Sequence, residues 1–275
     1  MAIPSRLLGS GLAPLAAVNI CGDVGTALVA TGTTNVDALG LSSAVNQIGT
    51  TAAGTGVITL GDSDTGVAVA SNATIGGTST GAITLGAATL VDGATLTVGT
   101  GIANTISLSS VTGTAANATS HLTINTTGAA TISGAVGTDI GTITITNSGG
   151  TTFSSTVDAA TVAITSTSLN NAVTFNGNLN LTSGMTVGAG AAAYNVAING
   201  SSNTIAGTTT FNNTGTVTLG NGSDTINFTG GVVATAPSGV TVNGTVTAAG
   251  TGVITLGDGN TGVTISSTST IGGGA

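Results

Sequence analysis

The sequence predicts an all-β protein built as a parallel β-solenoid (β-helix), on three observations. Short runs alternate an aliphatic residue with Thr, Ser or Asn, the pattern of strands with one buried face. Pairs such as Gly-Asp, Asn-Gly and Gly-Gly, which favour turns, separate these runs at intervals of about 8–12 residues. One segment of the chain occurs twice, and duplicated strand-turn-strand units are typical of stacked coils.

The alternating runs define the expected strands. Because successive side chains of a strand point to opposite faces, each run presents Val, Ile or Leu to one side and hydroxyl groups to the other. Helix-favouring surface residues are scarce: the chain contains no Glu and only one Lys or Arg. The clearest strands are residues 57–60, 82–85, 95–98, 142–146, 216–219 and 253–256.

The duplicated segment comprises residues 51–77 and residues 247–273, which are identical at 20 of 27 positions. A single coil cannot bury its own apolar face, so such units are expected to stack. We expect coils of about 18–25 residues, with Val, Ile, Leu and Ala inside and Thr, Ser and Asn outside. An intertwined trimeric β-prism, in which three chains share one core, is the alternative architecture.

The chain divides near residue 50 into two predicted regions. Residues 1–50 contain Arg6, the single Cys21 and two of the three prolines, Pro4 and Pro14. We expect this region to be an N-terminal attachment or capping segment, because exposed strand edges are usually covered. Residues 51–275 are the predicted repetitive solenoid. Residues 37–45 fit a short helix and a strand equally well.

Composition excludes several classes of partner. The formal net charge is −8, and one basic residue cannot neutralise a phosphate backbone, so we expect no nucleic-acid binding. No run of 18 apolar residues occurs, so we expect no membrane-spanning helix. Since Cys21 is the only cysteine, an intrachain disulfide is excluded.

Catalytic chemistry has few candidate residues, and we predict that the protein is not an enzyme. His121 is the only histidine, and no nucleophile motif accompanies it. Asp62 and Asp64 are the only close carboxylate pair, but the second copy of the repeat has Asp258 and Asn260 there. We therefore interpret these aspartates as turn residues.

No cofactor is expected, and calcium is the one metal hypothesis. Residues 220–226 match half of the nonapeptide that binds Ca²⁺ in parallel β-rolls, with Asp224 as the acidic residue. Asp62 and Asp64 lack the further acidic ligands of a calcium loop. Because the half-motif occurs once, whereas a roll needs copies on adjacent coils, a turn-forming role is favoured.

Thr-x-Thr pairs raise the possibility of an ordered hydroxyl array of the kind that binds ice. The pairs begin at Thr95, Thr142, Thr216 and Thr245, so the intervals between them along the chain are unequal. A regular array is expected to recur at one strict period. We therefore interpret the outward threonines as residues that favour strands and interact with water.

The N-terminal part of the chain carries one further signal, in residues 1–11, 14–15, 19–23, 30–34 and 50–57. Over these residues the sequence resembles the start of small structural proteins from tailed-bacteriophage virions. After residue 57 the chain departs from the family, continuing into the repeats where family members have a short β domain. The resemblance implies a location on the capsid surface, with the major capsid protein or other virion proteins as partners and a homotrimer as the assembly. It also implies that residues 1–50 attach to the shell, through Pro4, Arg6, Leu7, Leu8, Pro14, Leu15 and Ile20.

Two classes of function follow from these observations. The first is a non-enzymatic virion protein that decorates or stabilises a capsid or forms a short head fibre, anchored by its N-terminal segment. The second is an exported β-solenoid adhesin or surface-layer protein of the bacterial cell surface. The second class needs an export signal, and the apolar run of residues 1–22 is interrupted by Gly9, Gly11 and Pro14.

Overall fold

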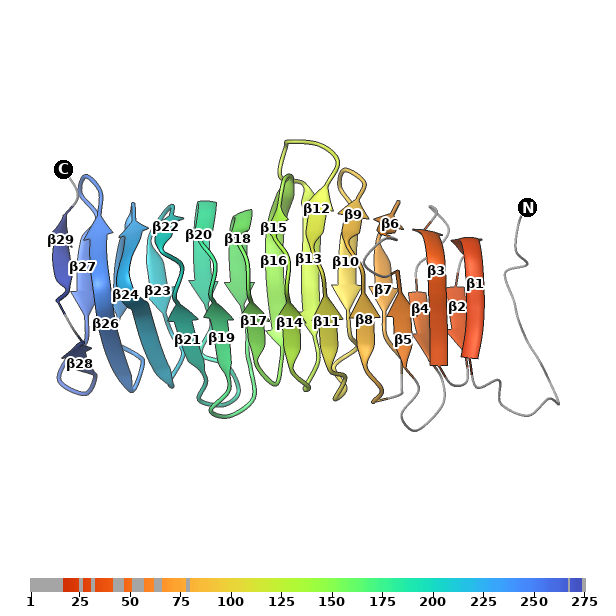
Figure 1. The fold of residues 1–275 in the computed structure, drawn as a ribbon. Helices are drawn as coiled ribbons and strands as arrows, with labels where there is room; N and C mark the ends of the chain where they lie inside the picture. Colours follow the sequence, from red (N-terminus) through yellow and green to blue (C-terminus); the bar gives the residue numbers. More distant parts are fainter. Residues whose placement is uncertain are drawn as a thin grey trace.

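The structure is a computed structural model that describes residues 17–24, 27–30, 33–41, 47–50, 57–61, 66–77, 80–266 and 268–273, with side chains described between residues 57 and 272. Its strands stack side by side from β1 to β29 as one parallel β-solenoid (Figure 1). Each strand before β27 pairs with a strand about one coil further along the chain, and all pairings among the described residues are parallel. The predicted fold class is therefore confirmed, in the solenoid form.

Three continuous ladders form three faces of the solenoid. The first face contains β5 (Ile58–Leu60), β8 (Ile83–Leu85), β11 (Ile106–Leu108), β14 (Ala130–Ile132), β17 (Thr151–Phe153), β19 (Ala172–Phe175), β21 (Asn195–Ile198) and β28 (Gly262–Ile265). The second face contains β6 (Val67–Val69), β9 (Ala88–Leu90), β12 (Val111–Gly113), β15 (Val136–Gly137), β22 (Ser202–Ile205) and β29 (Thr270–Gly273).

The third face contains β2 (Ala27–Ala30), β4 (Gln47–Thr50), β7 (Ala73–Ile75), β10 (Thr95–Val98), β13 (Ser120–Asn125), β16 (Ile140–Asn147), β23 (Thr209–Phe211), β25 (Gly231–Ala234) and β27 (Val253–Leu256). Six longer strands pass a corner and contribute to two faces. Of these, β1 (Ala17–Val24), β3 (Thr33–Leu41), β24 (Thr216–Phe228) and β26 (Gly239–Ala248) join the first and second faces, and β18 (Val157–Ile164) and β20 (Leu179–Val187) join the second and third.

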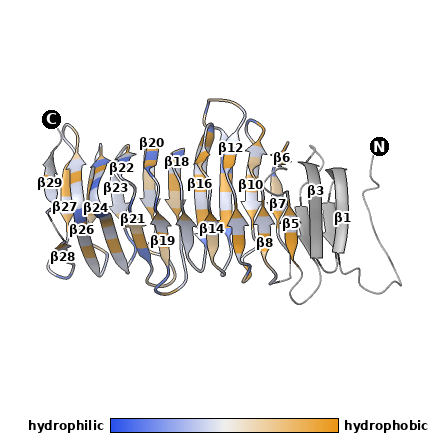
Figure 2. Ribbon diagram, in the orientation of Figure 1, coloured by the Kyte–Doolittle hydropathy of each residue, from blue (hydrophilic) through white to orange (hydrophobic). Residues whose placement is uncertain are grey.

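Alternation of buried and exposed positions explains these strands. In β26 every second residue is buried, and in β10 the buried residues are Leu96 and Val98. Inward residues of successive coils stack in columns, so hydrophobic residues recur along the stacked strands (Figure 2). The aromatic residues also lie inside: Tyr194, Phe153, Phe175, Phe211 and Phe228 are among the largest fully buried side chains.

Coil length varies along the solenoid. Ile143 pairs with Val162, whereas Leu96 pairs with Leu122, so the coil that starts at Leu96 is the longer of the two. Since the inward columns stay in register, the extra residues of the longer coils lie in the turns.

Parallel pairing extends through the region before residue 51. β1 pairs with β3, and β3 pairs with both β5 and β6. The predicted division at residue 50 therefore does not coincide with a break in the ladders. Of residues 37–45, the described part lies in the strand β3 and is not a helix. The attachment role of residues 1–50 stays a prediction.

Candidate functional site

The outer side of the third face carries two columns of residues that are mostly threonines, which we call the third-face threonine columns. One column is formed by Thr74, Thr97, Thr123, Thr144, Ala163, Thr186 and Thr210. The other is formed by Thr95, His121, Thr142, Thr161 and Gly184. Neighbouring positions are about 4.8 Å apart along a column, and the two columns are separated by two residues of one strand, about 6.7 Å.

These columns correct the expectation drawn from sequence spacing. Thr95 and Thr142 lie in one column, two coils apart, with His121 between them. Thr216 and Thr245 lie on the first and second faces instead. The irregular sequence gaps reflect coils of unequal length, so they are not evidence against a regular array on the third face.

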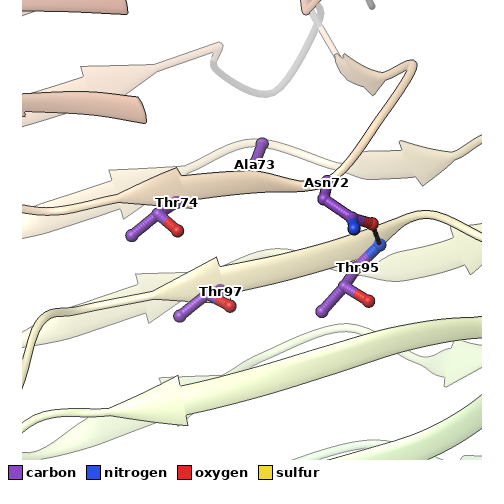
Figure 3. A pocket seen from close by; sticks show the side chains of 5 residues that line it. All are labelled: Asn72, Ala73, Thr74, Thr95 and Thr97. Carbon is purple, nitrogen blue, oxygen red and sulfur yellow. Dashed lines mark hydrogen bonds between the residues drawn. The ribbon is translucent and has the colours of Figure 1, made fainter. Parts of the chain in front are cut away.

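A shallow depression of about 360 Å³ lies at the N-terminal part of this surface, lined by Asn72, Ala73, Thr74, Thr95 and Thr97 (Figure 3). The Asn72 side chain is fixed there, because its Oδ1 accepts a hydrogen bond of 2.8 Å from the backbone N–H of Thr95 in the next coil. The lining offers hydroxyl and amide groups and no charged group. Such a surface can exchange hydrogen bonds with water or with an uncharged ligand.

A polar cluster at the start of β13 holds a protruding turn, and we call it the Asp139 corner: Asp92, Asn117, Thr119, Ser120 and Asp139. Asp139 Oδ1 accepts hydrogen bonds from the backbone N–H groups of Asn117 (3.0 Å) and Thr119 (3.2 Å). Its Oδ2 accepts a third from Ser120 Oγ at 3.0 Å. From the preceding coil, Asp92 accepts hydrogen bonds from Asn117 Nδ2 and Thr119 Oγ1. These hydrogen bonds connect the turn to the preceding coil through Asp92 and to the following coil through Asp139.

The backbone and the ionisation of Asp139 reflect this role. Asp139 has φ = 65°, Thr138 has φ = 51° and Ala118 has φ = 57°, a left-handed conformation that non-glycine residues adopt at an energetic cost. Burial raises the pKa of Asp139, but the hydrogen bonds from Thr119, Ser120 and Asn117 lower it, and the net pKa lies below the ordinary value. The carboxylate therefore stays ionised and acts as a hydrogen-bond acceptor.

Two other aspartates accept hydrogen bonds from backbone N–H groups two or three residues away, Asp258 in a turn and Asp224 at the irregularity within β24. Asp258 Oδ1 accepts hydrogen bonds from the backbone N–H groups of Asn260 (2.8 Å) and Thr261 (2.9 Å), and these bonds lower its pKa. Asp224 Oδ2 accepts one of 2.6 Å from the N–H of Asn221. The turn interpretation of Asp258 is thus confirmed.

The calcium hypothesis receives no further support from the described residues. Asp62 and Asp64 lie outside them. Among the residues that the structure does describe, no three His, Cys, Asp or Glu side chains are grouped as metal ligands.

His121 has a structural contact on the third face. Its Nδ1 accepts a hydrogen bond of 3.0 Å from the backbone N–H of Thr142, at the point where the register of β13 and β16 shifts. The imidazole nitrogen therefore replaces a carbonyl group that the shifted ladder does not supply. Because Nδ1 accepts here, the neutral ring carries its proton on Nε2.

Pro4, Arg6, Leu7, Leu8, Pro14 and Leu15 lie outside the described residues, and Ile20 is described only as backbone in β1. Within the described segments, no helix has the length and apolarity needed to cross a bilayer.

Sequence reasoning did not single out the Asp139 corner. Its hydrogen bonds connect residues of different coils, far apart in the chain, and no local motif marks such contacts. The interval between the strand at residues 111–113 and the strand at residues 120–125 is no longer than several other intervals, such as that between Val98 and Ile106, so spacing along the chain gives no signal either.

No family model, no curated protein and no solved structure matches this chain.

Proposed function

We propose that the chain is a non-enzymatic structural protein of a bacteriophage virion, which decorates or stabilises the capsid or forms a short head fibre. The observation that carries this proposal is the unbroken parallel ladder from β1 to β29, with one apolar core that stacks from Ile58 to Val246 among the residues whose side chains are described. A core packed at crystal-like density resists deformation. Such a molecule is suited to act as a stiff spacer.

The N-terminal segment would anchor this spacer. In the proposed mechanism, Pro4, Leu7, Leu8, Leu15 and Ile20 are buried against the shell, and Arg6 supplies the one basic contact. Each contact is weak on its own. Repetition by the symmetry of the capsid then adds these contacts through multivalency.

Immunogold labelling tests the location. Antibodies against the purified chain are applied to tailed particles and to cells of the organism that encodes the chain, and mass spectrometry reads the mature N-terminus. Gold at lattice points of the particles, with residues 3–15 retained, supports the proposal. Gold confined to the cell envelope, with residues 3–15 removed, contradicts it and favours the exported adhesin.

A second experiment tests the anchor. Capsids that lack the chain are incubated with the wild type, with Leu7→Asp/Leu8→Asp, or with the control Leu169→Asp, which places a single carboxylate on an exposed turn of the rod. We expect only the double variant to lose binding. Equal binding by all three proteins would refute the attachment role.

A further inference from the structure

The chain contains four Asn-Gly pairs, and the structure places them in different surroundings: Asn176-Gly177, Asn199-Gly200, Asn221-Gly222 and Asn243-Gly244. An asparagine is most prone to lose its side-chain amide when glycine follows, because glycine has no side chain to shield its backbone nitrogen and leaves the backbone free to turn. The reaction needs that nitrogen to reach Cγ of the asparagine. The packing around each glycine therefore decides which pair reacts in the folded chain.

Three of the four glycines are packed tightly against a neighbouring coil. A Cβ atom at Gly177 would collide with the backbone of Ser155. A Cβ atom at Gly200 would collide with the backbone of Gly177, and one at Gly244 with the backbone of Asp224. At these three places the backbone can turn only if the coils separate.

Hydrogen bonds restrain the same three pairs. The Nδ2 group of Asn199 donates one of 3.1 Å to Oδ1 of Asn176, so each of these two side-chain amides is held by the other. The backbone N–H of Gly244 donates one of 3.2 Å to Ser269 Oγ, so the nitrogen that would attack is already engaged. Reaction at any of the three pairs must first break a contact of the folded chain.

The remaining pair lies in a bulge of β24, which we define as residues 220–223. The pairing of β24 with the following coil jumps from Leu219 to Asp224, and its pairing with the preceding coil jumps from Leu219 to Thr225. Residues 220–223 therefore have no ladder partner on either side among the described strands. The extra length of this coil protrudes at the corner between the first and second faces.

Within the bulge, the Asn-Gly pair is open. The Asn221 side chain is exposed, and a Cβ atom at Gly222 would meet nothing within 4 Å. Only the backbone of Asn221 is held, since its N–H donates a hydrogen bond of 2.6 Å to Asp224 Oδ2. Gly222 follows that anchor, so its nitrogen can turn toward Asn221 Cγ without separating two coils.

We propose that Asn221 is a modification site, at which the folded chain converts asparagine to aspartate and isoaspartate without an enzyme. The backbone nitrogen of Gly222 bonds to Asn221 Cγ while the Cγ–Nδ2 bond breaks, and the proton of that nitrogen leaves with the amide as ammonia. Water then adds to either carbonyl carbon of the resulting five-membered imide and cleaves its bond to the nitrogen, which takes a proton. Cleavage at Cγ gives aspartate, and cleavage at the main-chain carbonyl gives isoaspartate. Either product adds one negative charge to the formal net charge of −8.

The bulge also has room for the isoaspartate product, in which the main chain runs through Cβ and is one atom longer. A longer main chain within a paired strand would shift the ladder by part of a residue. Residues 220–223 are not paired, so the added atom leaves the ladders of β24 on both sides intact.

Mass spectrometry of the full 275-residue chain, incubated at mildly alkaline pH in water enriched in oxygen-18, tests this proposal. Each ring that water opens takes up one labelled oxygen, and digestion with pepsin in acid locates it. We expect Asn221 to react at least about tenfold faster than Asn176, Asn199 and Asn243 in the folded chain, because the packed pairs react only when their coils open locally. In urea, where only the local sequence matters, this difference is expected to disappear.

Two variants of the bulge separate the reaction from other changes. Gly222→Ala places a methyl group beside the attacking nitrogen and is expected to slow labelling at Asn221 by at least about tenfold. Space around Gly222 and its φ, which lies outside the left-handed region, allow alanine there. Ser223→Ala keeps the Asn-Gly pair and is the matched control, expected to react like the wild type.

The proposal is overturned if the four asparagines of the folded wild type react at equal rates, if another of them reacts faster than Asn221, or if Gly222→Ala reacts as fast as the wild type. A thermal melt checks that each variant is folded. If Gly222→Ala unfolds, the comparison of the four pairs in the folded wild type and in urea decides alone. Because the reaction needs only this chain and water, the result is independent of the proposed virion location.

Discussion

The rings of Phe153 and Phe175 stack on successive coils, with centroids 5.0 Å apart and planes within 5° of parallel. The two residues pair in register in β17 and β19, and both are buried. They fill the inward column that aliphatic residues occupy in the neighbouring coils, Ile132 on one side and Ile198 on the other. The two rings are the largest side chains of that column, whose other members are Leu, Ile and Val.

Removing one ring is expected to leave a cavity that the flanking coils cannot fill. We predict that Phe175→Ala lowers the free energy of unfolding by about 3–5 kcal/mol and that Phe175→Leu lowers it by about 1–2 kcal/mol. Urea denaturation followed by circular dichroism measures both. A loss below about 1 kcal/mol for the alanine variant would show that the stack is not packed as described.

Thr151 places a hydroxyl group inside the core. It lies between Ala130 and Val173 in an inward column, and its Oγ1 has no hydrogen-bond partner among the described residues. A buried hydroxyl without a partner is unfavourable. We predict that Thr151→Val raises the free energy of unfolding by about 1 kcal/mol. The control is Thr152→Val on the outer side of the same strand, which is expected to change it little; equal effects would contradict the assignment of faces.

Position 99 requires a glycine because the backbone of Asn125 in the next coil lies close to it. Its φ is +89°, and a Cβ atom there would lie 2.1 Å from the carbonyl oxygen of Asn125 in the next coil. We predict that Gly99→Ala lowers the free energy of unfolding by more than about 2 kcal/mol, because strain and a backbone clash add. Gly259→Ala, where a Cβ meets nothing within 4 Å, is the control and is expected to change stability by less than about 0.5 kcal/mol. Thermal denaturation measures the stability of both variants. Equal melting temperatures for Gly99→Ala and Gly259→Ala would contradict this account.

Because of Asp139, the free energy of unfolding is expected to depend on pH under acidic conditions. The pKa of Asp139 is lower in the folded chain than the ordinary value near 4, so the unfolded chain takes up the proton first as the pH falls. The stability that the carboxylate contributes is complete above about pH 4 and is lost as the pH drops through the folded pKa. We predict that Asp139→Asn lowers the free energy of unfolding at pH 7 by about 1 kcal/mol and that the difference from the wild type shrinks below about pH 4.

Denaturation of both proteins at several pH values measures this difference. Asp158→Asn is the control, since Asp158 is an exposed carboxylate whose Oδ1 accepts a hydrogen bond from Asn180 Nδ2. A difference between the wild type and Asp139→Asn that is constant from pH 7 to pH 3 would argue against the hydrogen-bonded carboxylate.

The sequence predicts the strands and their faces because alternation is a local property. In the run Val57-Ile58-Thr59-Leu60, the two residues expected inside are buried and Thr59 is half-buried. The same reasoning applies to Leu96 and Val98. Stacking of the coils followed from the duplicated segment, which also supplied the solenoid prediction.

Register along the stack was not predictable from one sequence. The separation in sequence between Ile143 and Val162 is smaller than that between Leu96 and Leu122, because the turns absorb the difference. The Asp139 corner illustrates the reason: the turn at Asn117 is held by a carboxylate from the following coil. Contacts between residues of different coils depend on the lengths of the coils between them. The alignment of Thr95 with Thr142 in one column depends on those lengths as well.

Distances between spin labels on one outward column test the solenoid most directly. On the first face, Thr84 lies seven coils from Thr241 and Thr131 lies five coils from it. In a Cys21→Ser background, the label pairs Thr84→Cys/Thr241→Cys and Thr131→Cys/Thr241→Cys are measured by double electron–electron resonance. At one strand spacing per coil, we expect about 34 Å and about 24 Å. Two equal distances, or a difference far from about 10 Å, would contradict the parallel ladder on which the whole account depends.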